Sequence, residues 1–254
     1  MTVTIVTGAS SGIGRSLARR LALRGDPVAL LARRKPLLDE LAGEIANAGG
    51  QALALACDVT VAAEVAEAVR EVDKRLGPIE RLVANAGGGE PTFVDDFRAD
   101  AIAACLDLNV VGVARCIEAV LPDMLARRAG HLVAIGSLAA ARGLPTAAAY
   151  CAAKAALHNL IESLRIDLRG RGVAVTEIAP GPVRLKPKSK KARGFSIDVE
   201  DATALMERAI DRRDPYFAFP ARVAWATRLG RLLPIAFYDR ALAGRGRKPK
   251  PRAS

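Results

Sequence analysis

Short apolar runs alternate with longer segments of helical periodicity along the first two thirds of the chain. The apolar runs are rich in Val, Ile, Leu and Ala, as buried strands are. Between two of them, Leu37, Leu41 and Ile45 recur every four residues, which is a helical spacing. Continuous apolar strands separated by helices predict a parallel sheet covered on both faces, with right-handed crossovers.

The pattern predicts about seven strands and the helices that join them. Strands are expected at residues 2–6, 27–32, 51–57, 79–85, 130–137 and 172–180, with a candidate seventh at 216–220. Helices are expected from the glycine-rich turn to about residue 24 and at 36–48, 60–75, 98–124 and 147–169. The helix over 98–124 should bend or end near Pro122. We therefore expect a doubly wound α/β fold, with the catalytic domain over residues 1–220.

Composition excludes several classes of protein. The 254 residues are 51% hydrophobic and 4% aromatic, enough for one large core of Ala, Leu and Val. No apolar run reaches the roughly 18 residues of a membrane span, and no signal peptide is visible. The four cysteines lack a Cys-x-x-Cys spacing, and with two histidines they form no plausible metal set. We expect a cytoplasmic protein with reduced thiols and no metal.

The net charge of +11 comes from two segments of the chain. Residues 184–193 and 240–254 each contain six Lys or Arg and no acid, which leaves 26 basic and 27 acidic residues elsewhere. The remaining chain is therefore near neutral, and the basicity is local.

A glycine-rich turn follows the first expected strand. The stretch "TGASSGIG", residues 7–14, spaces Gly8, Gly12 and Gly14 as G-x-x-x-G-x-G between a strand and a helix. Such a turn lets the backbone approach a phosphate closely, and the helix N-terminus offers amide donors. It predicts a dinucleotide site that also includes Ser10, Ser11 and Ile13.

The end of the second expected strand indicates which dinucleotide is bound. An NAD site usually has an acid about 20 residues beyond the glycines, for the ribose 2′-hydroxyl. This chain has Arg33 and Arg34 there. Because arginine binds phosphate through paired hydrogen bonds, we expect NADP(H), with Arg33 as the principal contact and Arg34 as the secondary one. A solvated basic helix start is the alternative.

A series of motifs, in this order, resembles the short-chain dehydrogenase/reductase family. They are "TGASSGIG", "CDV" at 57–59, "NAG" at 85–87, Asn109, Ser137, Tyr150 with Lys154, and "PG" at 180–181. Each is common by chance, but the complete ordered set over about residues 2–182 is specific. The resemblance implies a Rossmann fold and an oxidoreductase that transfers hydride.

The resemblance also implies roles for single residues. Asp58 would contact the adenine amino group, Asn85 would steady the strand end beside the cofactor, and Asn109 would hold a water or a main-chain kink. The implied catalytic tetrad is Asn109, Ser137, Tyr150 and Lys154. Further implied cofactor contacts are Val59, Ala86, Gly87, Tyr150, Lys154, Pro180, Gly181 and Val183.

The stretch "AYCAAK" gives the resemblance a chemical rationale. Tyr150 and Lys154 lie four residues apart in an alanine-rich helix and so share one face. A cation about 4 Å from the phenol would lower its pKa from about 10 by up to about three units, toward the range that suits a general acid–base. Tyr150 is expected to transfer the proton, while Ser137 stabilises the substrate oxygen.

Two positions depart from the family pattern. Leu185 replaces a Thr that often touches the nicotinamide amide, so that contact would need the backbone or another side chain. Gly136 stands where a second Ser is common. We expect His131 and His158 to be structural and assign no role to Cys151.

The last third of the chain leaves several alternatives open. In the resembled family a lid follows "PG", here about residues 183–215, and its basic charge indicates either an anionic substrate or a solvated loop. Residues 221–254 form an expected amphipathic helix and basic tail, in the same domain or as an appendage. Trp225, Leu229 and Leu232 predict packing on the domain or on a sister subunit of a homodimer or homotetramer, or a peripheral membrane contact. Specific nucleic-acid binding is not expected, because the tail has no aromatic residue for stacking.

The leading hypothesis is an NADP(H)-dependent oxidoreductase that acts on a carbonyl or secondary alcohol. The alternative is an NADP(H)-binding regulatory or membrane-associated protein without turnover. The complete Asn, Ser, Tyr and Lys set favours the enzyme. The sequence does not identify the substrate.

Overall fold

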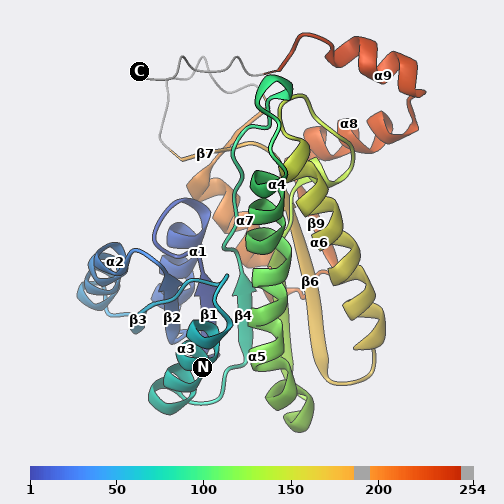
Figure 1. Ribbon diagram of the computed structural model, residues 1–254. Coiled ribbons are helices and arrows are strands. Elements are labelled where there is room, and N and C mark those ends of the chain that lie inside the picture. Colours follow the sequence, from blue (N-terminus) through green and yellow to red (C-terminus); the bar gives the residue numbers. More distant parts are fainter. Residues whose placement is uncertain (186–194, 247–254) are drawn as a thin grey trace, which may run out of the picture.

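A seven-stranded parallel sheet lies between two layers of helices in the computed structural model, which describes residues 1–185 and 195–246 (Figure 1). The strand order is β3-β2-β1-β4-β5-β6-β9, and all neighbours are parallel. The strands are β1 (Thr4–Thr7), β2 (Val28–Ala32), β3 (Ala52–Ala56), β4 (Arg81–Ala84), β5 (Gly130–Ile135), β6 (Val173–Pro180) and β9 (Tyr216–Phe219). The predicted doubly wound α/β sheet, including its seventh strand, is confirmed.

Alternating strand residues supply two separate cores. In β1, Ile5 belongs to one core and the next residue, Val6, to the other, because successive side chains of a strand point to opposite faces. Helices α3 (Ala62–Leu76), α5 (Gly112–Arg127) and α6 (Ala148–Asp167) cover one face. The other face is covered by α1 (Gly12–Leu23), α2 (Lys35–Asn47) and α7 (Val199–Asp211).

The helix expected over residues 98–124 is interrupted, but not at Pro122. Helix α4 (Ala99–Leu106) continues through a π-helical turn, η2 (Asp107–Val111), into α5, and Pro122 lies inside α5. The predicted bend or end near Pro122 is therefore wrong. Val120 and Met124 are buried on either side of the proline, and this burial maintains the helix although proline removes one backbone donor.

The expected lid over residues 183–215 is not one segment. A two-stranded sheet joins β7 (Val183–Arg184) to β8 (Ile197–Asp198), and α7 follows directly. The apolar side of α7 is fully buried against α1, so α7 belongs to the core and not to a lid. Residues 186–194, which hold most of the basic lid, lie outside the described residues.

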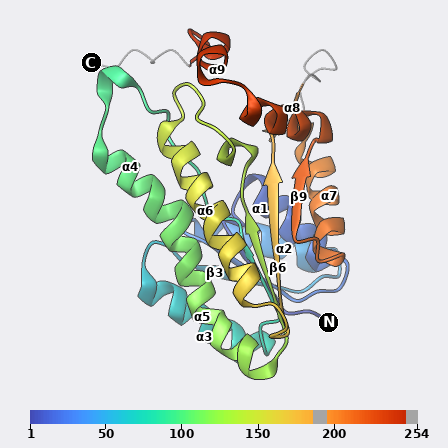
Figure 2. The ribbon, with the colours of Figure 1, turned by 90° about the vertical axis from the view of Figure 1, so that its right-hand side faces the viewer.

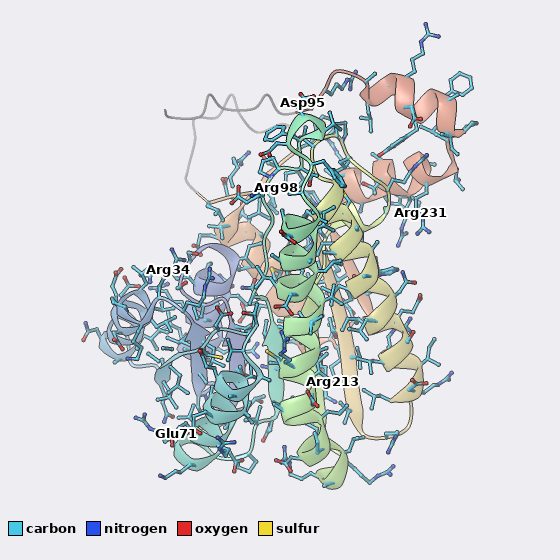
Figure 3. All side chains as sticks on the ribbon, in the orientation of Figure 1. Arg34, Glu71, Asp95, Arg98, Arg213 and Arg231 are labelled. Carbon is cyan, nitrogen blue, oxygen red and sulfur yellow. The ribbon has the colours of Figure 1, made fainter. Side chains whose placement is uncertain are left out.

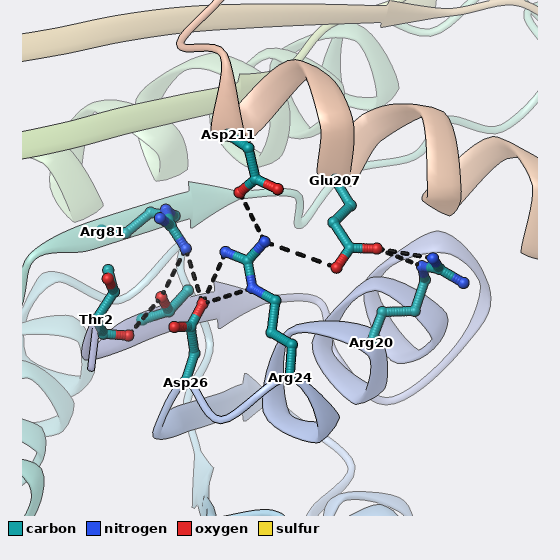
Figure 4. Close-up of polar contacts among 8 residues, drawn as sticks. Thr2, Arg20, Arg24, Asp26, Arg81, Glu207 and Asp211 are labelled. Atoms are coloured by element: carbon teal, nitrogen blue, oxygen red, sulfur yellow. Dashed lines mark hydrogen bonds and ion pairs between the residues drawn. The ribbon is translucent and has the colours of Figure 1, made fainter.

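Ion pairs hold α7 against α1 at the amino-terminal end of the sheet (Figure 4). The Arg24 guanidinium lies 2.8 Å from Asp26 and 2.6 Å from Asp211. Arg81, the first residue of β4, reaches the same Asp26 at 3.0 Å. Asp26 and Asp211 therefore neutralise Arg24 and Arg81 within the protein.

Helices α8 (Ala221–Leu232) and α9 (Ile235–Leu242) lie beyond the opposite, carboxyl end of the sheet (Figure 2). The expected packing of Trp225 on the domain is not seen, because Trp225 is 62% exposed and Ala224 is the buried residue of α8. Over residues 1–185 and 195–246, no helix is long and apolar enough to cross a membrane. The same ranges contain no His, Cys, Asp and Glu group suited to a metal ion.

Candidate active site

A cavity of about 490 Å³ opens at the carboxyl ends of β1 and β4. The strand order reverses at this point, where doubly wound sheets bind their ligands. Every residue predicted to contact the dinucleotide lines this cavity, and so do Ser137, Tyr150 and Lys154. The fold thus brings together residues that are up to 175 positions apart in the sequence, from Gly8 to Val183.

The glycine-rich turn lies tightly against the end of β4. Gly8 has a φ of +68°, and a Cβ there would lie 2.9 Å from the Ala86 Cα. At Gly14 a Cβ would lie 2.5 Å from the Gly8 carbonyl oxygen. Asn85 donates through Nδ2 to the Thr7 carbonyl at 2.9 Å, which ties β4 to β1. Asn85 therefore fixes the carboxyl end of β4 beside the glycine-rich turn.

Two arginines line the mouth of the cavity beside this turn. The Arg34 Nη2 donates to the hydroxyls of Ser10 at 2.9 Å and Ser11 at 2.8 Å. The Arg33 side chain is 77% exposed, with Nη1 3.7 Å from an Asp58 carboxylate oxygen. Backbone donation from Thr60 lowers the pKa of Asp58. A glycine cradle, a helix N-terminus and two guanidinium groups fit the phosphates of a dinucleotide.

The pKa of Tyr150 is raised above its ordinary value, because burial outweighs the opposing effect of the nearby Ser137 hydroxyl. The predicted lowering by Lys154 is wrong for this structure. The Lys154 ammonium donates to the Ile135 carbonyl at 2.9 Å and lies 5.8 Å from the centre of the Tyr150 ring. The spacing of four residues placed the two side chains on one face, but it did not fix where the ammonium points.

Lys154 is itself strongly affected by its surroundings. Its side chain is almost fully buried, and burial lowers its pKa to about 8, opposed by the charges of Cys105 and Glu177. Such a lysine loses its charge just above neutral pH. A shift of this kind beside a cavity is typical of functional sites.

Asn109 lies behind the cavity, within the π-helical turn. Its Nδ2 donates to the Gly88 carbonyl at 2.7 Å and to the Cys105 carbonyl at 2.8 Å. Its Oδ1 accepts from the Gly88 amide at 3.2 Å. Asn109 therefore fixes the loop after β4 and lies in a π-helical turn, but it does not line the cavity. π-helical turns are frequent at functional sites.

Sequence reasoning did not predict the contact between Glu177 and His158 near the site. Glu177, in the middle of β6, is buried and accepts from His158 Nδ1 of α6 at 2.7 Å if the ring carries that proton. Its other oxygen, Oε1, has no hydrogen-bond partner among the described residues. A Cβ at Gly136 would lie 2.5 Å from this oxygen, which explains the absence of Ser there. A glutamate within an apolar strand was the sequence signal that could have revealed it.

Leu185 occupies the position where the resembled family often has Thr. It lines the cavity near Gly12, whose Cβ position lies 3.2 Å from Leu185 Cδ2, and its side chain offers no hydrogen bond. An amide contact at this edge must therefore come from another group.

Comparison with known proteins agrees with this geometry. Residues 2–206 match the family model described as short chain dehydrogenase. An uncharacterized oxidoreductase of Myxococcus xanthus is 42% identical over 239 residues, which cover 93% of this chain and 94% of that protein.

Two solved structures share the fold. An alcohol dehydrogenase from the archaeon Thermococcus sibiricus, complexed with 5-hydroxy-NADP, gives a TM-score of 0.78 at 27% identity and covers 86% of this chain and 96% of its own. A 7α-hydroxysteroid dehydrogenase complexed with NADH and 7-oxo glycochenodeoxycholic acid gives a TM-score of 0.78 at 25% identity. The match covers 86% of this chain and 92% of that one.

Proposed function

Because this chain belongs to the short-chain dehydrogenase family, we propose that it is an NADP(H)-dependent oxidoreductase that interconverts a carbonyl group and a secondary alcohol. One observation carries the proposal: Ser137, Tyr150 and Lys154 lie in the same cavity as the glycine-rich turn and the two arginines. Acid–base groups and a dinucleotide cradle thus meet in one site.

A bound nicotinamide dinucleotide supplies the hydride in reduction and accepts it in oxidation. Tyr150 donates the proton of its hydroxyl to the substrate oxygen. Its raised pKa keeps the phenol protonated near neutral pH, which suits the direction of reduction. The Ser137 hydroxyl, which lines the same cavity as Tyr150, donates to the same oxygen and stabilises the charge that develops there.

Lys154 and Asn109 position the other groups. The buried Lys154 ammonium, held by the Ile135 carbonyl, supplies positive charge beside the tyrosine. Asn109 holds the loop that contains Gly88, and this loop lines one side of the cavity. Both residues then act through the placement of Tyr150 and of the bound dinucleotide.

The choice of NADP(H) over NAD(H) rests on the arginines. Arg33 is exposed at the mouth of the cavity, where it can reach a 2′-phosphate, and Arg34 lies between the second strand and the glycine-rich turn. A guanidinium stabilises a phosphate, whereas the carboxylate of a usual NAD site would repel it.

A substrate panel tests the proposal. The purified protein is incubated with NADPH or NADH and a series of aldehydes, ketones and secondary alcohols, and absorbance of the reduced nicotinamide is followed. We expect turnover with at least one carbonyl compound and faster turnover with NADPH. Tight dinucleotide binding without turnover on the whole panel would instead favour a regulatory protein.

A further inference from the structure

Large apolar side chains are unusually exposed on α8 and α9, here called the C-terminal hairpin (residues 221–242). Trp225, Leu229 and Leu232 follow each other at a spacing that places them on one side of α8. Leu233, Ile235 and Phe237 follow at once, and the six side chains are between 47% and 81% exposed. In the described residues before the hairpin, exposed large apolar side chains are scattered from residue 1 to residue 216. Clusters of this kind mark interaction sites.

The hairpin is fixed to the body of the protein. Arg142 donates through Nη1 to the carbonyls of Gly230 at 2.8 Å and Leu233 at 3.0 Å. Its guanidinium lies 3.8 Å from the centre of the Tyr238 ring, and the Tyr238 hydroxyl donates to the Gly143 carbonyl at 2.8 Å. These contacts use the inner side of the hairpin, so that its apolar side chains are exposed on an ordered element.

The charge of α8 is entirely positive. It contains Arg222, Arg228 and Arg231 and no acidic residue. Arg231 lies on the inner side of α8, where it lines a cavity with Glu162 and Tyr216 (Figure 3). The Arg228 guanidinium lies 5.4 Å from the Trp225 ring. A tryptophan and leucines among arginines are typical of helices that lie in a membrane interface.

The rest of the chain offers no suitable cover for this surface. The segments outside the described residues, 186–194 and 247–254, contain no acidic and no large apolar residue. A second copy in a two-fold contact centred on the hairpin would set one positively charged α8 against another. The matching surface must therefore be both apolar and negative.

We propose that the C-terminal hairpin binds the surface of a membrane that contains anionic lipids. The apolar side chains enter the boundary between headgroups and acyl chains. Arg222 and Arg228, which flank the apolar side of α8, contact the headgroups. The hairpin follows β9 at the carboxyl end of the sheet, so this attachment places the cavity end of the protein next to the membrane. The proposal does not depend on the reaction that the cavity catalyses.

Trp225 is the only tryptophan in the chain and reports directly on this contact. The full-length protein is mixed with vesicles of phosphatidylcholine, with or without phosphatidylglycerol. We expect a blue shift of Trp225 emission, quenching by brominated lipid and flotation with the anionic vesicles only, all weakened by high salt. Replacing Arg222 and Arg228 by Gln should lower partitioning by about tenfold or more.

A matched pair of variants separates the hairpin from general surface effects. Leu229 is 62% exposed, and Ile166, at the far end of α6, is 64% exposed. Leu229→Glu should lower partitioning at least about tenfold, whereas Ile166→Glu should leave it unchanged. Thermal unfolding confirms that both variants fold.

Three outcomes would overturn the proposal. The first is unchanged Trp225 emission with anionic vesicles, and the second is equal binding to neutral ones. The third is a change of Trp225 emission with protein concentration in the absence of vesicles. It would be accompanied by a dimer, seen in analytical sedimentation, that Leu229→Glu dissociates. That last result would assign the hairpin to contact between copies of the chain.

Discussion

Charged side chains meet different partners at the two ends of the sheet. At the amino-terminal end, Arg81 and Arg24 share Asp26, and Arg24 also pairs with Asp211 (Figure 4). At the carboxyl end, the Lys154 ammonium donates to a carbonyl and the Arg34 guanidinium to two hydroxyls. Burying a charge is costly unless it is paired. The buried arginines Arg24 and Arg81 are thus neutralised by carboxylates, whereas Lys154 and Arg34 are held by neutral oxygen atoms and keep positive charge that a bound anion can use.

The comparison predicts that substitutions at the two ends of the sheet affect different properties of the protein. Substitutions at the amino-terminal end should lower stability and leave catalysis intact. Substitutions at the carboxyl end should change catalysis or binding and leave the free energy of unfolding nearly intact. The predictions below test this separation, beginning with the largest expected effect.

Tyr150→Phe should lower the turnover number about a thousandfold or more, because general acid–base catalysis contributes about 10²–10⁴-fold and the phenylalanine ring can still pack. Steady-state reduction of the best substrate measures this, and NADPH binding should change little. Cys151→Ala, one residue along the same helix, serves as the control and should stay nearly as active as the unaltered protein. Near-normal turnover in Tyr150→Phe would refute the assigned proton donor.

Arg81→Met should destabilise the protein by about 3 kcal/mol, at the lower end for a broken buried ion pair, because Asp26 keeps Arg24 as a partner. Chemical denaturation measures the free energy of unfolding. The matched change Arg15→Met removes ion pairs with Glu40 and Glu44 at the surface. It should lower the free energy of unfolding by less than about 1 kcal/mol. Loss of kcat/KM in folded Arg81→Met would contradict the separation of the two ends.

Arg33→Ala should reduce the preference for NADPH over NADH by about tenfold to a hundredfold, the cost of one charge-assisted contact. Arg34→Ala should reduce it less, and should also free the Ser10 and Ser11 hydroxyls. Binding titrations with both dinucleotides measure the ratio. The unaltered protein binding both equally well would remove the basis for the proposed NADP(H) specificity.

The sequence predicted the features that depend on local pattern. Apolar runs and helical spacing identified the sheet, and the glycine spacing located the turn at Gly8. Ordered motifs named the residues that the cavity brings together. The first two signals are carried by neighbouring residues and the third by the order of short motifs along the chain, and the fold confirms the strands and helices that the first two predicted.

Features that depend on contacts between distant elements were not predictable in this way. The hydrogen bond that Pro122 removes is a local cost, which the sequence shows. The burial of the residues on both sides of it, which keeps α5 continuous, depends on contacts with other elements. The direction of the Tyr150 pKa depends on burial and on where the Lys154 ammonium points. Glu177 meets His158 only because β6 and α6 lie together.

The smallest expected effect concerns this buried glutamate. Glu177 lies among Lys154, His158 and Glu162 of α6 and Tyr216 of β9. Its negative charge raises the pKa of Lys154, which burial otherwise lowers to about 8. Glu177→Gln should therefore let Lys154 lose its proton at lower pH.

If catalysis requires the Lys154 ammonium, activity is complete below its pKa and is lost as the pH rises through it. The alkaline limb of kcat/KM should then move to lower pH in Glu177→Gln, with less than about a tenfold change in the rate below that limb. Glu162→Gln removes an exposed carboxylate of the same helix and should leave the limb almost unchanged. An alkaline limb that stays in place in Glu177→Gln, or moves to higher pH, would show that the buried carboxylate does not stabilise the ammonium during catalysis.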